Sequence, residues 1–212
     1  MSAAGENAAG SGYTGVMASA DPLERYRDRR DFARTPEPAG ADGSETATRR
    51  FVVQRHRARR LHYDFRLEVD GALASWAVPK GPTLDPQVRR AAFHVEDHPL
   101  DYGGFEGVIP GGQYGSGDVI VWDNGTWQPS GTDDPAAALT AGELHFDLFG
   151  AKLRGRFVLV RTRVDAHGKE EWLLLHKRDQ FAVRGWDPEE HPRSVLSDRT
   201  NDDVRADPDR PE

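Results

Sequence analysis

Residues 61–69 carry the pattern that most restricts how this chain can fold. Apolar side chains alternate strictly with polar or charged ones along the whole stretch, and this period of two is typical of a half-buried β-strand. The pattern predicts a strand that packs one face and presents histidine, aspartate and arginine in line on the other. Same-face neighbours on a strand are about 7 Å apart, so this face offers metal ligands followed by a guanidinium for an anion. The apolar positions are Leu61, Tyr63, Phe65, Leu67 and Val69, and the polar ones are His62, Asp64, Arg66 and Glu68.

Strand patterns recur along most of the remaining chain. Turn residues separate many of them: Asp70-Gly71 and Asn124-Gly125 are typical of two-residue hairpin turns, and residues 166–168 predict a longer one. Several short strands joined by turns indicate a mostly β fold, either an antiparallel sandwich or a small closed barrel. The further strands are predicted at 51–53, 73–78, 91–96, 119–122, 144–148, 157–164 and 172–176.

One or two short helices and two tails complete the predicted organisation. Asp21 as N-cap and Pro22 at the first helical position predict one helix, which Pro36 would end. The run 134–142, which begins with Asp-Pro and ends near a glycine, predicts another. Residues 1–20 are rich in alanine, glycine and serine, and residues 197–212 are acidic and contain proline, so both ends are expected to be disordered tails. A single domain is therefore predicted over residues 21–196.

Charge is distributed unevenly along this acidic chain. The 212 residues have a net charge of −7, which argues against a protein that coats nucleic acid non-specifically. Basic residues nevertheless gather between Arg49 and Tyr102, whereas acidic residues gather in the C-terminal tail. A locally basic groove on an acidic protein suits the recognition of a few phosphates at a nucleic-acid terminus.

The composition also limits the kind of metal site and the location. The chain has no cysteine, so any metal would be held by imidazole and oxygen ligands. No apolar run approaches the roughly 20 residues that a membrane helix needs. The N-terminus lacks both the basic and the apolar region of a secretory signal. We therefore expect a cytoplasmic protein without a membrane partner.

Short motifs follow one another in order along the chain, among them Gln54-Arg-His56, Leu61-His62-Tyr-Asp64-Phe-Arg66 and Val95-Glu96-Asp-His98. This series resembles the 3′-phosphoesterase domain of bacterial DNA ligase D. The resemblance covers roughly residues 23–179 and implies a compact, mostly β fold, a small antiparallel β-barrel with a metal and phosphate site in a surface groove. It also implies an enzyme that removes a 3′-terminal ribonucleoside and then hydrolyses the remaining 3′-phosphate to a 3′-hydroxyl in non-homologous end joining. The motifs include Gln54-Arg-His56, Leu61-His62-Tyr-Asp64-Phe-Arg66, Ser75-Trp-Ala-Val-Pro-Lys80-Gly-Pro, Val95-Glu96-Asp-His98-Pro-Leu-Asp-Tyr102 and Phe105-Glu-Gly-Val-Ile-Pro110.

The resemblance assigns roles to individual residues. His56, His62 and Asp64 correspond to the metal ligands, and two imidazoles with a carboxylate suit Mn²⁺ or another first-row divalent cation. His62 thereby belongs to the catalytic set as well as to the metal set. The phosphate-contacting residues are expected to be Arg66, His98 and Tyr102. Further functional positions, which would support the ligands or contact the substrate strand, fall on Arg30, Asp31, Glu37, Gln54, Lys80, Arg90 and Glu96.

These roles lead to a chemical hypothesis. A divalent metal would neutralise phosphate charge while Arg66 holds phosphate oxygens with two nitrogens. His98 is the first candidate for the proton donor to the leaving 3′-oxygen, with Tyr102 as an orienting hydrogen-bond donor. A covalent phosphohistidine is disfavoured because the His-x-Lys-x4-Asp pattern of phospholipase D-type enzymes is absent.

Other interpretations stay open from the sequence alone. The alternating strand is also the ordinary solvent face of an antiparallel sheet, and the arginines from Arg55 to Arg60 are either a solvated run or contacts to a strand. The glycine-rich run 110–117 predicts a turn rather than a phosphate cradle. Two other functions remain: a catalytically silent adaptor that binds DNA ends, and a cupin-like small-molecule enzyme. The arginine content near the ligands favours phosphate over an apolar oxygenase pocket.

The expected partners follow from the length of the chain. Polymerase and ATP-dependent ligase domains do not fit into 212 residues, and Lys177-Arg-Asp-Gln180 does not supply the lysine motif of a ligase. We expect a free-standing, nucleoid-associated phosphoesterase that acts on the 3′ ends of DNA or RNA/DNA primer-templates. Ku and a separate ATP-dependent DNA ligase are the expected protein partners.

Overall fold

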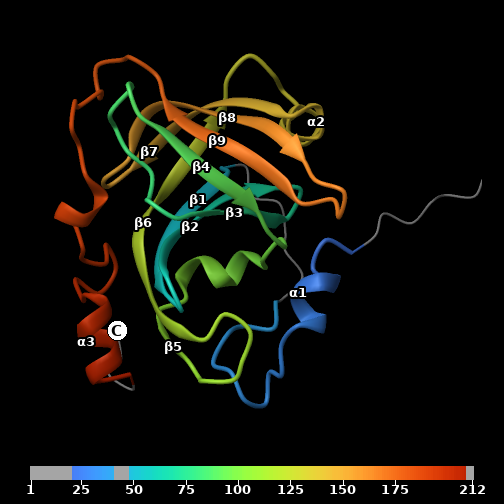
Figure 1. Cartoon of the computed structure of the whole chain (residues 1–212), viewed down its shortest axis with the longest axis vertical. Coiled ribbons are helices and arrows are strands. Elements are labelled where there is room, and N and C mark those ends of the chain that lie inside the picture. The colour runs from blue at the N-terminus through green and yellow to red at the C-terminus, as the bar shows by residue number, and fades with distance from the viewer. Residues whose placement is uncertain (1–20, 41–47, 209–212) are drawn as a thin grey trace, which may run out of the picture.

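The computed structural model describes residues 21–40 and 48–208, which form one antiparallel β-barrel with short helices around it (Figure 1). Eight strands close in the order β1-β2-β3-β4-β9-β8-β7-β6, since β6 pairs back with β1, and β5 adds to the free part of β6. The predicted mostly β, small antiparallel barrel is thus confirmed. The strands are β1 (Arg50–Arg57), β2 (Leu61–Val69), β3 (Ala72–Val78), β4 (Arg89–His94), β5 (Gly107–Ile109), β6 (Gly117–Pro129), β7 (Glu143–Gly150), β8 (Arg154–Val164) and β9 (Glu170–His176).

The two predicted two-residue turns have different outcomes. Asp70 and Gly71 join β2 to β3 with φ values of 48° and 77°, as a tight hairpin turn of this type requires. The turn predicted at Asn124-Gly125 is wrong, because both residues lie inside the long strand β6. A Cβ at Gly125 would collide with the backbone of Phe149 in β7, so this glycine permits a close approach of strands rather than a turn.

Apolar residues form two cores on opposite faces of the same strands. The inward residues of β2, among them Tyr63, Phe65 and Leu67, join the large core inside the barrel. A smaller core lies outside the barrel, where Val52 of β1 and Leu73 of β3 pack with side chains from the segments that cover them. The polar face of β2 is therefore not a solvent face: Asp64 and Arg66 are 8 % and 2 % exposed.

Helices and 3₁₀ turns cover the outside of the barrel. The second predicted helix is confirmed as α2, where Asp134 accepts from the Ala137 amide at 2.9 Å and Gly142 ends the helix with φ 96°. The first is shorter than expected, because the chain leaves the helix after Asp28 and turns Arg30 toward the barrel. The elements are α1 (Glu24–Asp28), η1 (Leu100–Gly104), α2 (Pro135–Ala141), η2 (Pro188–Glu190) and α3 (Asn201–Ala206).

The C-terminal segment differs most from the prediction. The expected disordered tail is wrong for residues 197–208, because α3 packs beside β6 and buries Val204 completely (Figure 1). The Asn201 amide donates to the carbonyls of Arg55 and Asp118 at 3.1 and 2.9 Å, which ties α3 to β1 and β6. The periodicity of six residues is too short to predict such packing. The predicted tail 1–20 and residues 209–212 lie outside the described residues.

The helices of the described ranges are all short. None of them is long and apolar enough to cross a membrane.

Replacement of Val204 tests the packing of α3. Val204→Ala should lower the free energy of unfolding by about 2 kcal/mol, because it removes buried methyl groups and leaves a cavity. Val164→Ala, at a half-exposed position of β8, is the control and should change stability by about 0.5 kcal/mol or less. Urea unfolding followed by tryptophan fluorescence measures both, and equal effects of the two variants would contradict the packing of α3.

Candidate active site

The pairing of β1 with β2 brings the three predicted metal ligands together. His56 lies directly opposite His62 in the register of the two strands, and Asp64 follows His62 on the same face of β2. The ligand atoms of all three residues lie within 4.8 Å of one another. A paired strand ladder rather than a loop therefore positions the set.

Backbone carbonyls determine which nitrogen of each histidine carries a proton. His56 Nε2 is 2.8 Å from the Gly115 carbonyl oxygen, and His62 Nδ1 is 3.0 Å from that of Arg60. A carbonyl only accepts, so these nitrogens are the donors. The opposite nitrogens, His56 Nδ1 and His62 Nε2, approach the Asp64 carboxylate at 3.4 and 3.6 Å. In neutral histidines two unprotonated nitrogens thus converge with a carboxylate, which is a donor set that fits a first-row divalent cation.

Arg66 is buried beside these ligands and is held on two sides. Its Nε donates to Gln54 Oε1 at 3.0 Å, and its Nη1 donates to Ser75 Oγ at 2.8 Å. Nη2 lies 3.4 Å from Asp64 Oδ2 and is the nitrogen turned toward the ligands. Arg66 can therefore offer Nη2 to an anion, but the two-nitrogen grip expected from the sequence is not available while Gln54 holds Nε.

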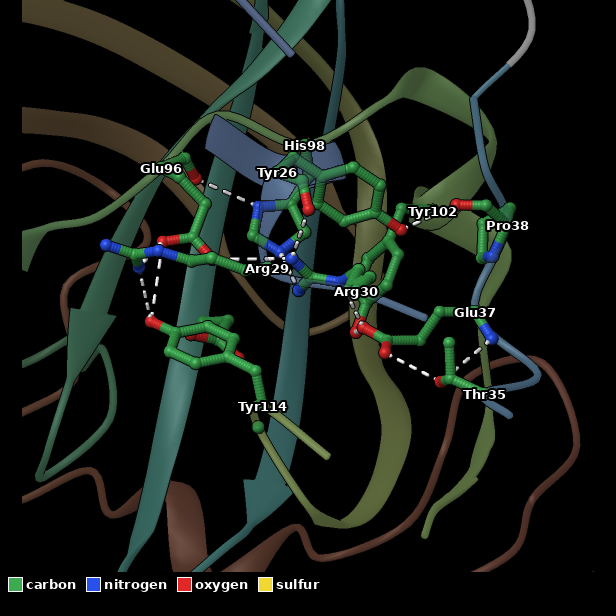
Figure 2. Close-up of polar contacts among 12 residues, drawn as sticks. Tyr26, Arg29, Arg30, Thr35, Glu37, Pro38, Glu96, His98, Tyr102 and Tyr114 are labelled. Carbon is green, nitrogen blue, oxygen red and sulfur yellow. Dashed lines mark hydrogen bonds and ion pairs between the residues drawn. The ribbon is translucent and has the colours of Figure 1, made fainter. Parts of the chain in front are cut away.

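A second set of polar and charged residues lies beside the ligands and comes from the segments that cover the barrel (Figure 2). Arg30, just after α1, donates from Nε to Glu37 at 2.9 Å, and its Nη1 lies 3.5 Å from Glu96. The Tyr102 hydroxyl, from η1, also donates to Glu37, at 3.1 Å. Arg30 Nη2 lies 3.3 Å from His98 Nε2. Arg30 is thus linked to Tyr102 through the buried carboxylate of Glu37 and to His98 directly.

The hydrogen bonds of His98 define its protonation. Its Nδ1 is 2.9 Å from the Glu96 carbonyl and so carries the proton, while Nε2 accepts from Arg30. Burial, reinforced by the charges of Arg66 and Arg30, holds the pKa of His98 well below its ordinary value. His98 is therefore a neutral imidazole whose unprotonated Nε2 faces Arg30 in the cavity. The proton-donor role expected from the sequence requires it to gain a proton first.

Asp64 differs from His98 in that its neighbours, rather than burial, determine the direction of its pKa shift. Burial alone would raise the pKa of Asp64, but the charge of Arg66 and the hydrogen bonds that the two histidines donate when protonated outweigh it and hold the pKa well below its ordinary value. Asp64 therefore stays ionised as a ligand. Burial, with the charge of Glu37, raises the pKa of Tyr102 well above 10, so its phenol remains a donor.

A cavity of about 180 Å³ joins the two groups. Four predicted functional residues do not line it. Gln54 is buried behind Arg66, and Asp31 is exposed in the turn after α1. Lys80 is exposed after β3, and Arg90 is at the opposite end of β4 from Glu96, about 20 Å along the strand. Nine predicted residues do line the cavity: Arg30, Glu37, His56, His62, Asp64, Arg66, Glu96, His98 and Tyr102.

Several residues at this site escaped the sequence analysis. Ser75 holds Arg66, and the carbonyl of Gly115 holds His56. Arg29 donates to Glu96 at 2.7 Å, and Tyr114 lines the cavity mouth. Ser75 lay in one of the motifs that carry the family resemblance, and Tyr114 and Gly115 lay in the glycine-rich run 110–117, but neither stretch indicated these contacts. The run does form turns that lead into β6, as predicted.

Comparison with known families agrees with this site. The model of the DNA ligase D 3′-phosphoesterase domain matches residues 54–161. The chain belongs to this family. The match includes the metal-ligand candidates, Arg66, His98 and Tyr102, whereas Arg30 and Glu37 precede it.

Curated members of the family are longer proteins. The chain is 54 % identical over 191 residues to the multifunctional non-homologous end joining protein LigD of Pseudomonas aeruginosa, which covers 87 % of this chain and 22 % of that protein. It is 47 % identical over 166 residues to the LigD DNA repair protein of Mycobacterium tuberculosis, which covers 76 % and 21 %. The corresponding protein of Mycolicibacterium smegmatis is 42 % identical over 172 residues. The chain thus spans about a fifth of the length of these relatives.

Loss of either histidine ligand should weaken metal binding. We expect His56→Ala and His62→Ala to lower the affinity for Mn²⁺ at least about tenfold, because each removes a nitrogen from the donor set. Isothermal titration calorimetry with MnCl₂ measures the affinity without requiring catalysis. His145→Ala on β7, outside the cavity, is the matched control and should bind like the wild type. Equal affinities of all four proteins would show that the metal binds elsewhere.

The depressed pKa of His98 predicts a pH dependence of stability. Below the ordinary value of 6.5 the unfolded chain gains a proton that folded His98 does not, so this group makes stability fall as pH falls from 6.5 toward its folded pKa. In His98→Gln the slope of unfolding free energy between pH 6.5 and 5 should be smaller by up to about 1.4 kcal/mol per pH unit. Urea unfolding at several pH values measures it. At pH 8 the difference in unfolding free energy between the two proteins reports the loss of the packing of His98. Parallel curves of unfolding free energy against pH down to pH 5 would contradict a depressed pKa.

Proposed function

We propose that this chain is a metal-dependent 3′-phosphoesterase that trims the 3′ ends of DNA, first removing a terminal ribonucleoside and then hydrolysing the 3′-phosphate. The observation that carries the proposal is the convergence of His56 Nδ1, His62 Nε2 and the Asp64 carboxylate beside Arg66 Nη2, which is turned toward them. A cation and a guanidinium side by side fit two oxygens of one phosphate.

Mn²⁺ or another first-row divalent cation is the proposed cofactor. His56, His62 and Asp64 would hold it, and the carbonyls of Gly115 and Arg60 keep the two imidazoles in the required tautomers. When bound, such a cation supplies a Lewis acid that withdraws charge from a phosphate oxygen. Calcium prefers six to eight oxygen ligands, so a set dominated by imidazole disfavours it.

Other residues of the cavity have the proposed roles in phosphate binding and proton transfer. Arg66 Nη2 and Arg30 Nη2 donate to phosphate oxygens from two sides of the cavity. Both guanidiniums are nearly buried, so their interaction with an anion is only weakly screened. When Arg30 Nη2 turns from His98 to a bound phosphate, His98 Nε2 takes up a proton from solvent and donates it to the 3′-oxygen as the bond to phosphorus breaks. Water supplies the new oxygen on phosphorus and releases a proton to solvent. Tyr102 and Glu37 hold Arg30 in position between these steps.

The proposed context is bacterial end joining at nucleoid-associated DNA ends. The relatives bear names of non-homologous end joining proteins, and the site suits a primer-template end that a ligase requires as a 3′-hydroxyl. Ku and an ATP-dependent DNA ligase are the proposed partners of the chain. They would act before and after the trimming step.

Two labelled primer-templates test this function, one with a single 3′-ribonucleotide and one with a 3′-phosphate. With Mn²⁺ the wild type should convert both to 3′-hydroxyl ends. His56→Ala and His98→Ala should each lower the rate by about 100-fold or more, since one removes a metal ligand and the other a proton-transfer group. Denaturing gels resolve the products, and His145→Ala should retain the wild-type rate.

Two results would contradict the proposal. Wild-type protein that binds the ends but changes neither would identify an end-binding adaptor. Conversion that survives in both histidine variants would assign the activity to another site.

A further inference from the structure

The four arginines of the run 55–60 have different environments. Arg55 donates to Glu189 and Asn201 at 2.7 and 2.6 Å, and Arg57 donates to Asp118 of β6 at 2.9 Å and to Asp202 of α3 at 2.5 Å. These two serve to attach the C-terminal segment. Arg59 and Arg60 are exposed in the turn between β1 and β2, and neither has an acidic partner among the described residues. They are therefore available to an anionic ligand.

Arg59 and Arg60 line a groove of about 680 Å³ that adjoins the active site. One wall is the turn 58–60, and the other is the loop 113–116. His62, Tyr114 and Gly115 line both this groove and the catalytic cavity. A chain-like ligand can therefore lie in the groove while its end reaches the metal ligands.

Tyr114 stands where the groove meets the cavity, and its ring is held in place. Its hydroxyl accepts from Arg29 Nη1 at 2.8 Å and lies 3.4 Å from Glu96 Oε2. The Arg29 guanidinium lies 4.9 Å from the ring centroid, and that of Arg30 lies 5.6 Å away. Both guanidiniums lie on the side of the ring turned toward Glu96 (Figure 2). Tyr114 is nevertheless 47 % exposed, so the ring also presents a surface to solvent.

We propose that this groove holds the last nucleotides of the substrate strand, with Tyr114 stacking on a base and Arg59 and Arg60 contacting backbone phosphates. This inference rests on the proposed function and specifies its substrate contacts. When the 3′-phosphate lies among Arg66, Arg30 and the metal ligands, the base of that nucleotide lies at the cavity mouth, beside Tyr114. The strand continues in the 5′ direction along the groove, where the next phosphates meet Arg59 and Arg60.

The chemistry of the groove suits the last, unpaired nucleotides of the substrate strand at a primer-template end. An exposed aromatic ring stacks on an unpaired base of any sequence, because every base has a π face. The two free guanidiniums neutralise about two phosphates, which is a small electrostatic contribution compared with that of proteins that track along a duplex. The groove should therefore bind unpaired 3′ ends with little sequence preference and with a weak dependence on salt.

Steady-state kinetics with a single-stranded oligonucleotide that bears a 3′-phosphate test the inference in the presence of Mn²⁺. Tyr114→Ala should raise KM about tenfold or more, because it removes the stacking surface. Tyr114→Phe keeps the ring and should stay close to the wild type, which separates stacking from the hydroxyl contacts. Arg59→Ala/Arg60→Ala should raise KM and lower the slope of log(1/KM) against log[salt] by about 1.4, from about 0.7 for each lost phosphate contact.

Two controls match these variants in chemistry. Phe149→Ala removes an exposed aromatic side chain on β7, and Arg89→Ala removes an exposed arginine on β4, both outside the groove. Neither should change KM or the salt slope. Because para-nitrophenyl phosphate lacks a strand, its hydrolysis should be unchanged in Arg59→Ala/Arg60→Ala, whose side chains line the groove but not the catalytic cavity.

Failure of this inference differs from failure of the proposed function. If the wild type hydrolyses the oligonucleotide and the groove variants keep its KM and salt slope, the strand lies elsewhere and the inference is overturned. If the wild type hydrolyses neither the oligonucleotide nor para-nitrophenyl phosphate, the proposed function fails. Fluorescence anisotropy with the same oligonucleotide then tests whether the groove binds the strand. Weakened binding by Tyr114→Ala and by the double arginine variant would support a strand-binding groove, and unchanged binding would overturn it.

Discussion

The buried carboxylate of Asp64 is the group on which the site depends. A carboxylate away from water is costly unless it is paired, and Asp64 is surrounded by Arg66 and two histidines. Arg66 is itself buried and needs partners, which Gln54 and Ser75 supply. Gln54 in turn donates to the carbonyls of Tyr102 and Phe105 at 3.0 Å and so positions η1. One ionised group thus determines a chain of contacts from β2 to the segment that carries Tyr102.

The barrel makes this arrangement possible because two faces of β1, β2 and β3 are buried for different reasons. The inner face belongs to a continuous apolar core, which keeps the strands in register. The outer face is covered by short segments with charged side chains. Within the cavity the carboxylates of Asp64, Glu37 and Glu96 outnumber the guanidiniums of Arg66 and Arg30 by one. A divalent cation at the ligand set would reverse that sign, so metal binding and phosphate attraction are electrostatically coupled.

The sequence predicted the parts of this site that follow from local periodicity. Alternation along 61–69 is enough to place His62, Asp64 and Arg66 on one face, and Asp70-Gly71 is enough to predict the hairpin that follows. The burial of that face was not predictable, since it depends on α1 and η1 packing from 30 or more residues away. The same limit explains α3: six residues carry too little periodicity to distinguish a packed helix from a polar tail. Arg90 shows a different limit, because the resemblance to a family does not reveal that β4 places this residue outside the cavity.

Loop 110–117 links the metal site to the substrate groove more directly than any strand does. The Gly115 carbonyl holds the His56 ring, while the neighbouring Tyr114 bonds to Arg29 and Glu96 on the opposite side of the cavity. The loop is therefore attached at two adjacent residues to both groups of polar side chains that line the cavity. Gly115 has φ 73°, a conformation that favours glycine. A side chain there would strain the turn that aims its carbonyl at His56. The glycine-rich composition predicts only a turn from the sequence. In the structure it also orients His56, because the ring presents Nδ1 to Asp64 while the loop carbonyl accepts from Nε2.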